Sequence, residues 1–349
     1  MKRVLYITNI EVPYRTIFFN LLAKECDLTV LFERRCSSNR NNKWAVSSEK
    51  LFDVAYLDGW NVGNENSFSL EIFGWLKKKW DFIIVGCCNS KVQLAAMMYM
   101  RLKKIPYIVN FDGEQFINSG IKSKIKRFIL RNAKFYLVAG EKSGESIQKG
   151  FGYTNIVPYY FSSLTDEELK NNSKNETERD EYVLVVGQYF DYKGMDVALE
   201  CARNTPNINY KFVGMGVRTE IFIKENGRIP DNVEIIPFLQ KEQLQEEFKR
   251  CKVFVLPSRQ ECWGLVINEA ASWGTPIVST LGSGAAVEFL IDSKFSNYLS
   301  YPNDIKSLQL CIEKCYFADN KEYSLFLKEK SKEYSIEKSV KVHMSIINL

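Results

Sequence analysis

The chain has 349 residues, of which 46% are hydrophobic and 26% are charged, so it holds enough apolar side chain for one large or two medium domains. This composition excludes a disordered, collagen-like or disulfide-stapled protein. The net charge of +5 is uneven, because residues 1–165 carry 24 basic and 14 acidic side chains whereas residues 166–349 carry 23 and 28. The basic half suits a phosphate-bearing ligand, an anionic membrane surface or a nucleic acid.

The first eight residues form a short apolar run without the long core of a signal peptide, and we therefore expect a cytoplasmic protein. The longest apolar runs, such as residues 82–85 and 253–256, fall far short of the roughly 20 residues that a membrane-spanning helix needs.

Short runs rich in Val, Ile and Phe alternate with amphipathic stretches through the first half. We predict strands at residues 4–8, 28–32, 82–85, 107–110 and 135–139, and helices at residues 16–24, 91–103 and 121–131. Continuous apolar strands that alternate with helices predict a parallel sheet covered on both faces.

The second half repeats this pattern after a polar stretch, residues 166–180, which we interpret as a linker. Strands are predicted at residues 182–186, 210–213, 233–236, 253–256 and 276–279, and helices at residues 195–203, 241–250 and 265–273. The prediction is an α/β protein with two doubly wound, Rossmann-like domains, residues 1–165 and 181–349, that face each other across a cleft. The helical stretch from Ile305 onward is expected to pack back across this cleft.

The number and spacing of the cysteines and the single histidine limit which disulfides, metal sites and general bases the chain can form. The nine cysteines form neither a paired framework nor two CxxC knuckles, so reduced thiols are expected. The single histidine, His343, leaves few ways to build a metal site and disfavours mechanisms with a histidine general base. We therefore expect no metal and no cofactor.

Residues 257–276 (PSRQECWGLVINEAASWGTP) are the most informative segment. They leave a predicted strand, pass Gly264 at a helix start and place Glu269 about one and a half turns into the helix. A helix N-terminus with a glycine offers free N–H groups to an anion such as a diphosphate. The carboxylates of Glu261 and Glu269 suit hydroxyl groups on either side of it, one on a sugar and one on a ribose.

This segment resembles the E-x7-E signature of the family 4 retaining glycosyltransferases, which have the GT-B fold. Three further segments of the second half resemble that family in the same order and spacing, namely residues 186–196 (VGQYFDYKGMD), 213–216 (VGMG) and 236–239 (IPFL). The first half resembles the family more weakly, in the variant found in bacterial polysaccharide-type transferases.

The resemblance implies a role for each matching residue of the second half. Glu261 would bind the donor sugar and Glu269 the ribose, while the amides of Gly264, Leu265 and Val266 would hold the diphosphate. Lys193, which follows the donor loop Gly187-Gln188, would neutralise the leaving group. Gln188 stands where the family usually has an arginine, so either Lys193 acts alone or a second cation such as Arg259 contributes.

Candidate acceptor residues follow two strands of the first half. Tyr14 and Arg15 open the first helix, and Asn110, Asp112 and Glu114 follow a later strand. By the resemblance, a retaining mechanism needs no histidine, because a departing phosphate oxygen accepts the proton of the incoming hydroxyl. Asp112 or Glu114 would then orient the acceptor or stabilise positive charge on the sugar.

Residues 121–131 (IKSKIKRFILR) combine apolar residues at helical spacing with a basic face. Two interpretations stay open. The basic face is simply solvated, or it rests on anionic lipid and places the protein on the inner face of the cell membrane.

We conclude from the sequence that a sugar is transferred, with retained configuration, from a UDP-sugar or GDP-sugar to a carbohydrate or lipid-linked acceptor in polysaccharide or glycolipid synthesis. Two alternatives remain, a catalytically silent GT-B subunit and a sugar-nucleotide epimerase or phosphorylase. A nicotinamide dehydrogenase is disfavoured because the glycine fingerprint is incomplete, and a nucleic-acid binder because no basic-aromatic motif is present.

Overall fold

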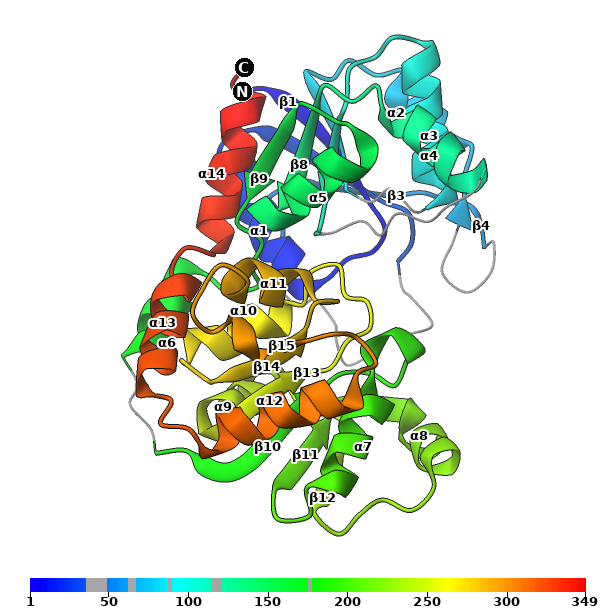
Figure 1. Ribbon diagram of the computed structural model, residues 1–349. Helices are drawn as coiled ribbons and strands as arrows, with labels where there is room; N and C mark the ends of the chain where they lie inside the picture. The colour runs from blue at the N-terminus through cyan, green and yellow to red at the C-terminus, as the bar shows by residue number, and fades with distance from the viewer. Residues whose placement is uncertain (36–48, 62–66, 87–89, 114–120, 175–177) are drawn as a thin grey trace. The chain divides into compact units, whose positions relative to one another are not determined.

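The computed structural model describes residues 1–35, 49–61, 67–86, 90–113, 121–174 and 178–349 (Figure 1). The chain divides into two compact units. The first consists of residues 1–161 together with residues 336–349, and the second of residues 162–335.

The first unit contains a sheet of seven parallel strands in the order β3-β2-β1-β6-β7-β8-β9. The strands are β1 Arg3–Thr8, β2 Asp27–Phe32, β3 Asp53–Tyr56, β6 Phe82–Val85, β7 Ile108–Phe111, β8 Phe135–Ala139 and β9 Ile156–Tyr159, and a short hairpin, β4 Trp60–Asn61 and β5 Ser67–Phe68, stands apart. The helices are α1 Pro13–Ala23, α2 Glu71–Leu76, α3 Lys91–Leu102, α4 Ile121–Leu130, α5 Glu141–Phe151 and α14 Ile336–Ile347.

Alternating side chains of β1 face two different layers of helices, because successive residues of a strand point to opposite faces. Leu5 and Ile7 lie in a buried cluster with residues of α2 and α3. Tyr6 points the other way and contacts Phe18 and Phe19 of α1, with ring centroids 6.4 and 4.9 Å apart. The predicted parallel sheet with both faces covered is thus confirmed.

The second unit contains six parallel strands in the order β12-β11-β10-β13-β14-β15. The strands are β10 Asp180–Val186, β11 Asn209–Val213, β12 Val233–Ile236, β13 Cys251–Leu256, β14 Ile277–Thr280 and β15 Leu299–Ser300. The helices are α6 Asp166–Ser173, α7 Met195–Asn204, α8 Thr219–Asn226, α9 Lys241–Arg250, α10 Leu265–Ser272, α11 Gly284–Leu290, α12 Ile305–Phe317 and α13 Lys321–Ser331.

Residues 166–180 differ from the polar linker that we expected, because the division between the units falls after Phe161 and residues 166–173 form helix α6. Thr165 caps this helix in a capping box with Glu168. Leu169 and Asn172 are buried, and the amide of Asn172 donates to the hydroxyl of Ser272 at 2.8 Å. The helix therefore belongs to the second unit.

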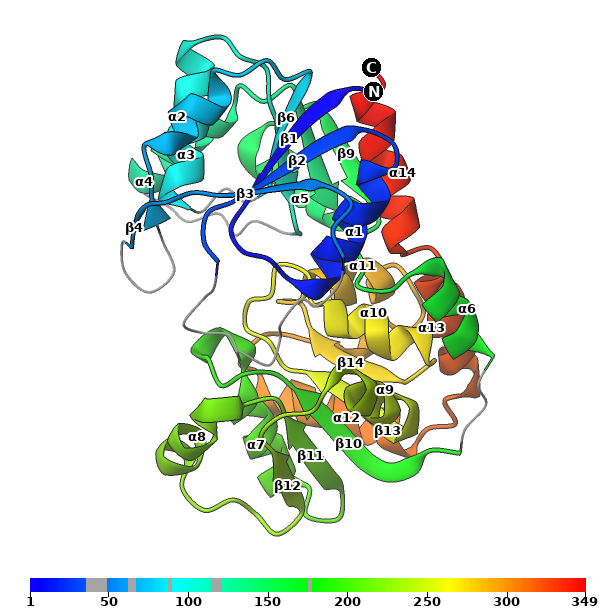
Figure 2. The same ribbon diagram turned by 180° about the vertical axis from the view of Figure 1, so that it is seen from behind.

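The C-terminal helix α14 belongs to the first unit and not to the second, whose sequence directly precedes it. It lies beside α1 and β9, as both views show (Figures 1 and 2). Of the helical stretch from Ile305 onward, residues 336–349 return to the first unit, outside its predicted boundaries, whereas α12 and α13 stay in the second unit.

Each sheet has one position where the strand order changes direction, between β1 and β6 in the first unit and between β10 and β13 in the second. Loops at the carboxyl ends of strands diverge at such a point, which makes it the usual ligand position in open α/β sheets. The loops that follow β10 and β13 carry the segments that the sequence singled out.

Candidate functional site

Two loops of the second unit, residues 187–194 after β10 and residues 257–264 after β13, are fixed against each other. Gly194 adopts φ +66°, and a Cβ atom at this position would lie 2.1 Å from the carbonyl oxygen of Pro257. The carbonyl of Tyr192 accepts hydrogen bonds from the amides of Arg259 and Gln260, at 2.9 and 3.1 Å. Only glycine permits this close approach.

This contact brings Lys193 and Glu261 together. Lys193 ends the 3-10 turn η1 Asp191–Lys193, and its ammonium group forms an ion pair with the Glu261 carboxylate. The two side chains are 22% and 18% exposed, so both remain accessible to a ligand. Two groups separated by 68 residues in the sequence therefore form one charged pair.

Helix α10 begins beside this pair. Its cap, Gly264, has φ +99°, and a Cβ atom there would lie 3.1 to 3.3 Å from Leu256, Ser283 and Glu261. Leu265 and Val266 occupy the first turn, where no carbonyl of the helix itself reaches their amides. The partial positive charge of this helix N-terminus therefore lies close to Glu261, the partner of Lys193.

Two glycines that the sequence analysis missed hold the backbone of Glu261. Its amide donates to Gly282 at 2.7 Å, and its carbonyl accepts from Gly284 at 3.1 Å. A Cβ atom on Gly282 or Gly284 would lie 2.4 or 2.3 Å from a carbonyl oxygen of the loop after β13. The Gly-Ser-Gly sequence at 282–284 was the available signal, since closely spaced glycines mark close backbone approaches.

Glu269 lies further along α10, where its carboxylate accepts a hydrogen bond from the hydroxyl of Ser163 at 2.7 Å. Burial raises the pKa of Glu269, and the Ser163 hydroxyl and Lys241 lower it by less. A buried carboxylate with raised pKa gains from hydrogen-bond donors, and ribose hydroxyl groups are such donors. Sequence reasoning missed Ser163, which is remote from the motif.

Arg259 is already neutralised within the protein. Its guanidinium donates to both carboxylate oxygens of Asp196, at 2.8 and 2.5 Å, and this hydrogen bonding raises the pKa of Arg259. Arg259 is therefore not a free cation that could replace the arginine expected at position 188. Arg218 also contacts this loop, because its guanidinium lies 4.0 Å from the Phe190 ring centroid and donates to the carbonyl of Tyr189 at 3.3 Å.

In the first unit, Arg15 of α1 forms an ion pair with Asp112, which directly follows β7. Arg15 is buried, whereas the Asp112 side chain is 34% exposed. Burial opposes the charge of Arg15, but Asp112 and neighbouring tyrosines hold the pKa of Arg15 above its usual value. Asp112 also accepts a hydrogen bond from the Tyr159 hydroxyl at 3.2 Å.

The other predicted acceptor residues are less accessible or lie outside the described residues. Asn110 is 2% exposed, and its amide donates to the Tyr159 hydroxyl at 2.9 Å. Tyr14 is half-buried and packs against Phe161, with ring centroids 5.9 Å apart. Glu114 falls outside the described residues. Among the described acceptor candidates, Asp112 has a side chain that is both charged and accessible to solvent.

His343, on α14, is a part of the first unit's polar network that the sequence did not reveal. Its Nε2 lies 2.6 Å from the amide oxygen of Asn110, and its Nδ1 lies 2.7 Å from the carbonyl oxygen of Ser339. Burial lowers the pKa of His343 to about 4. No short-range pattern predicts a contact between residues 233 positions apart.

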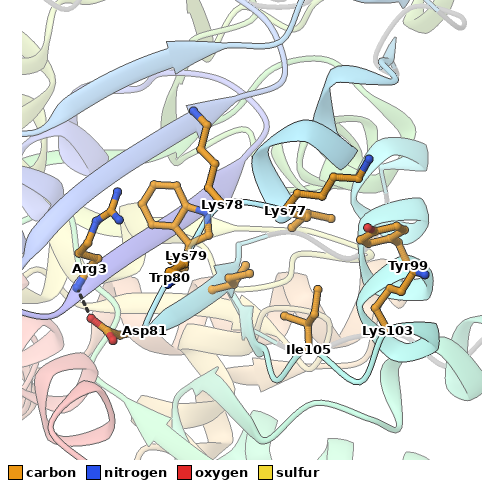
Figure 3. A pocket seen from close by; sticks show the side chains of 11 residues that line it. Arg3, Lys77, Lys78, Lys79, Trp80, Asp81, Tyr99, Lys103 and Ile105 are labelled. Atoms are coloured by element: carbon orange, nitrogen blue, oxygen red, sulfur yellow. Dashed lines mark hydrogen bonds between the residues drawn. The ribbon is translucent and has the colours of Figure 1, made fainter.

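A basic surface lies at the amino ends of the strands of the same sheet, where β1 and β6 begin. A shallow pocket of about 740 Å³ is lined there by Arg3, Lys77, Lys78, Lys79 and Lys103 together with Trp80 and Tyr99 (Figure 3). On α4, Ile125 and Phe128 are 52% and 53% exposed. The Arg101 side chain of α3 stacks on Phe128 at 3.9 Å from the ring centroid.

The described part of the chain contains no group of three or more His, Cys, Asp or Glu side chains that would hold a metal ion. It also contains no helix with the length and apolarity required to cross a bilayer.

Sequence comparisons find similarity to glycosyl transferases. Residues 166–333 match the family model of the glycosyl transferases group 1. A protein of Haemophilus influenzae described as an uncharacterized glycosyltransferase is 27% identical over 279 residues, which cover 76% of this chain and 75% of the relative. The O-antigen chain mannosyltransferase C of Escherichia coli is 27% identical over 175 residues, which cover 48% of this chain and 46% of that protein.

Sucrose-phosphate synthase from Thermosynechococcus elongatus has a similar structure, with a TM-score of 0.72 and 13% identity over 99% of this chain and 98% of that chain. This likeness shows the fold, which is GT-B as predicted. The family and sequence matches support glycosyl transfer as the activity of this chain. They give no support to the epimerase, phosphorylase or silent-subunit alternatives.

Proposed function

We propose that the chain is a retaining, metal-independent glycosyltransferase of family 4 type. It moves a sugar from a nucleotide-diphosphate sugar, with UDP or GDP as the nucleotide, to an acceptor hydroxyl in polysaccharide or glycolipid synthesis. One observation carries the proposal. The Lys193–Glu261 ion pair lies beside the N-terminus of α10, at the point of the second sheet where the strand order changes direction.

Different residues of the second unit bind the diphosphate, the sugar and the ribose of the donor. The amides of Gly264, Leu265 and Val266 face the diphosphate, and Lys193 approaches it as the phosphate leaves. The two contributions replace the divalent cation that many transferases use, which is the basis for a metal-independent site. Glu261 then exchanges its bond to Lys193 for bonds to sugar hydroxyls, and Glu269 accepts from the ribose.

The proposed transfer retains the configuration of the anomeric carbon. The bond between the anomeric carbon and the phosphate oxygen breaks, and the acceptor oxygen bonds to the same face of the sugar. The acceptor hydroxyl gives its proton to the departing phosphate oxygen, so no histidine base is needed. Asp112, fixed by Arg15, orients the acceptor hydroxyl.

The test is the hydrolysis or transfer of nucleotide sugars by the purified protein and by Lys193→Ala. We expect turnover of at least one UDP-sugar or GDP-sugar, retained anomeric configuration by NMR, and activity that survives EDTA. Lys193→Ala should lose about 100-fold or more in rate, because it removes the charge at the leaving group. Lys224→Ala, which changes an exposed lysine of α8, is the control.

Turnover of no UDP-sugar or GDP-sugar by a folded protein would contradict the proposed function. An inverted product, or a rate abolished by EDTA and restored by a divalent cation, would leave glycosyl transfer intact but overturn retention or metal independence.

We also propose that the basic surface of the first unit binds anionic membrane and places the protein peripherally on the cytoplasmic side. The five cations around the pocket and the exposed Ile125 and Phe128 of α4 support this proposal. Each basic residue near such a surface contributes about 1 kcal/mol.

Sedimentation with vesicles of phosphatidylglycerol and phosphatidylcholine tests the membrane proposal. We expect the protein in the pellet at low salt, and in the supernatant at high salt. Changing Lys77, Lys78 and Lys79 to Glu should abolish binding, whereas the same change at the exposed Lys224, Lys306 and Lys321 of the second unit should not. Wild-type protein that stays in the supernatant at low salt would contradict the proposal.

A further inference from the structure

Three elements of the first unit contribute to one chain of polar contacts that ends on Asp112. His343 of α14 contacts Asn110 at the end of β7, Asn110 contacts the hydroxyl of Tyr159 at the end of β9, and this hydroxyl donates to Asp112. The three distances are 2.6, 2.9 and 3.2 Å. From this geometry we propose that His343 is a positioning residue for Asp112.

The inner part of this chain is closed to solvent and only its end is open. His343, Asn110 and Tyr159 are 1%, 2% and 3% exposed, whereas the Asp112 side chain is 34% exposed. A buried polar group costs free energy unless its hydrogen bonds are satisfied, and each of these groups is satisfied by the next. The network therefore fixes the orientation of the one group that a substrate can reach.

The His343 ring itself has little freedom. It packs edge-on against Phe18 of α1 and Tyr159 of β9, with centroid distances of 4.8 and 5.0 Å. Its Nδ1 is held by the carbonyl of Ser339, one turn earlier on the same helix. The amide oxygen of Asn110 lies next to Nε2, so its NH2 group faces the Tyr159 hydroxyl. The ring thus determines where the amide lies, and the other end of the amide meets Tyr159.

Asp112 receives a second constraint from Arg15, which approaches from α1. Arg15 donates to one oxygen of Asp112, and the Tyr159 hydroxyl donates to the other. With both oxygens held from the buried side, the remaining lone pairs point toward solvent. His343 acts on the acceptor through Asn110 and the Tyr159 hydroxyl, and this role rests on the proposed function of Asp112.

The single histidine makes a direct test possible in the full-length protein, because its imidazole gives one set of ¹⁵N signals. We expect Asp112→Asn and Tyr159→Phe to shift the His343 Nε2 resonance, since the change is transmitted through Asn110. Asp27→Asn, an exposed carboxylate of the same unit, should leave it in place. An Nε2 resonance unmoved by both Asp112→Asn and Tyr159→Phe would overturn the proposal.

The second measurement compares two variants of His343. In His343→Gln the side-chain amide reaches the position of Nε2 and keeps the contact with Asn110, whereas His343→Asn reaches only the position of Nδ1. The assay is transfer to octyl glycosides from whichever nucleotide sugar the wild-type protein hydrolyses. His343→Asn should raise the KM for the octyl glycoside about tenfold and leave the donor KM and donor hydrolysis unchanged.

His343→Gln should stay within about threefold of wild type, which separates positioning from folding. An equal loss in the Gln and Asn variants, or a loss of donor hydrolysis in both, would indicate a purely structural histidine and overturn the proposal. The NMR result does not depend on any substrate. A coupled Nε2 resonance in a protein without turnover would therefore mark the failure of the proposed function alone.

Discussion

The candidate sites of the two units are built in different ways. In the second unit, two nearly continuous segments supply Lys193, Glu261 and the helix start at Gly264, and glycines allow their backbones to touch. In the first unit, Asp112 is held by side chains from α1, β9 and α14 that are far apart in the sequence. The residues of a site that is built from short, nearly continuous segments can be predicted from a sequence. The residues of a site that depends on long-range side-chain contacts cannot.

Gly194→Ala should break the second unit's site most severely. The added Cβ atom would lie 2.1 Å from the carbonyl oxygen of Pro257, so the loops that bring Lys193 to Glu261 must separate. We expect the rate of donor hydrolysis to fall about 1,000-fold, because the variant displaces both the charge of Lys193 and the loop that positions it. The control is Gly216→Ala, which has a similar φ of +55° but no atom within 4 Å of the added Cβ. Equal activity of the two variants would refute the role of this close approach.

The first unit should respond to pH through His343. Its pKa is about 4 in the folded protein against 6.5 for an unperturbed histidine, so the unfolded chain binds more protons between these values. The neutral ring makes its full contribution to the free energy of unfolding above pH 6.5, and this contribution is lost as the pH falls toward 4. It amounts to about 3 kcal/mol. Urea unfolding of wild type and His343→Gln from pH 4 to 8 measures it, and identical pH dependences would contradict the assignment.

Glu269→Gln sharpens the comparison by separating binding from stability. We expect about tenfold weaker binding of UDP or GDP, because the amide cannot accept ribose hydroxyl groups as a carboxylate does. The pKa of Glu269 is raised in the folded protein, so the unfolded chain releases this proton at lower pH and ionisation opposes folding.

The variant should therefore unfold at the same or a higher temperature than wild type at pH 8, and this advantage should shrink toward pH 4.5. Differential scanning fluorimetry with and without nucleotide measures both effects, with the exposed Glu220→Gln as the control. Unchanged nucleotide affinity in Glu269→Gln would remove Glu269 from the donor site.

The smallest expected effect concerns the attachment of α6. Asn172→Ala removes the hydrogen bond from Asn172 to Ser272, so we expect about 1 kcal/mol lower stability and unchanged donor hydrolysis. Chemical denaturation measures the first and the hydrolysis assay the second. A change in hydrolysis without a change in stability would show that α6 acts on the site and is more than a packed helix.

Much of the fold could be predicted because central strands are continuous apolar runs. Strand β6 has the predicted bounds, 82–85, and the helix predicted at 265–273 matches α10 within one residue. The strands that were not predicted are β3, β9 and the two-residue strands β4, β5 and β15; of these, β3 and β9 lie at the two edges of the first sheet. Edge strands are less buried and tolerate residues that interrupt an apolar pattern, such as Pro158 in β9.

Five helices, α2, α5, α6, α8 and α11, were not predicted, and two of them show why. Helix α5 contains Gly144 and Gly150, whose low helix propensity hides the amphipathic pattern. Helix α6 is polar enough to read as a linker, although Thr165 and Glu168 have the spacing of a capping box. The capping pair was the local signal that the analysis overlooked.

The candidate donor residues could be named because most of them lie in one contiguous motif, residues 257–276. The partners that hold them, Ser163 and Gly282 among others, required the folded chain. His343 is the clearest limit, because a lone histidine in a helix has no local pattern that connects it to Asn110. Long-range hydrogen bonds depend on how elements pack, and sequence periodicity does not encode that.

A crystal structure of the protein with UDP or GDP, whichever raises its unfolding temperature more, tests the central claim most directly. We predict the diphosphate against the amides of Gly264, Leu265 and Val266, with the Lys193 ammonium group drawn from Glu261 toward the phosphate. A nucleotide bound away from the loops that follow β10 and β13 would contradict this account of the second unit.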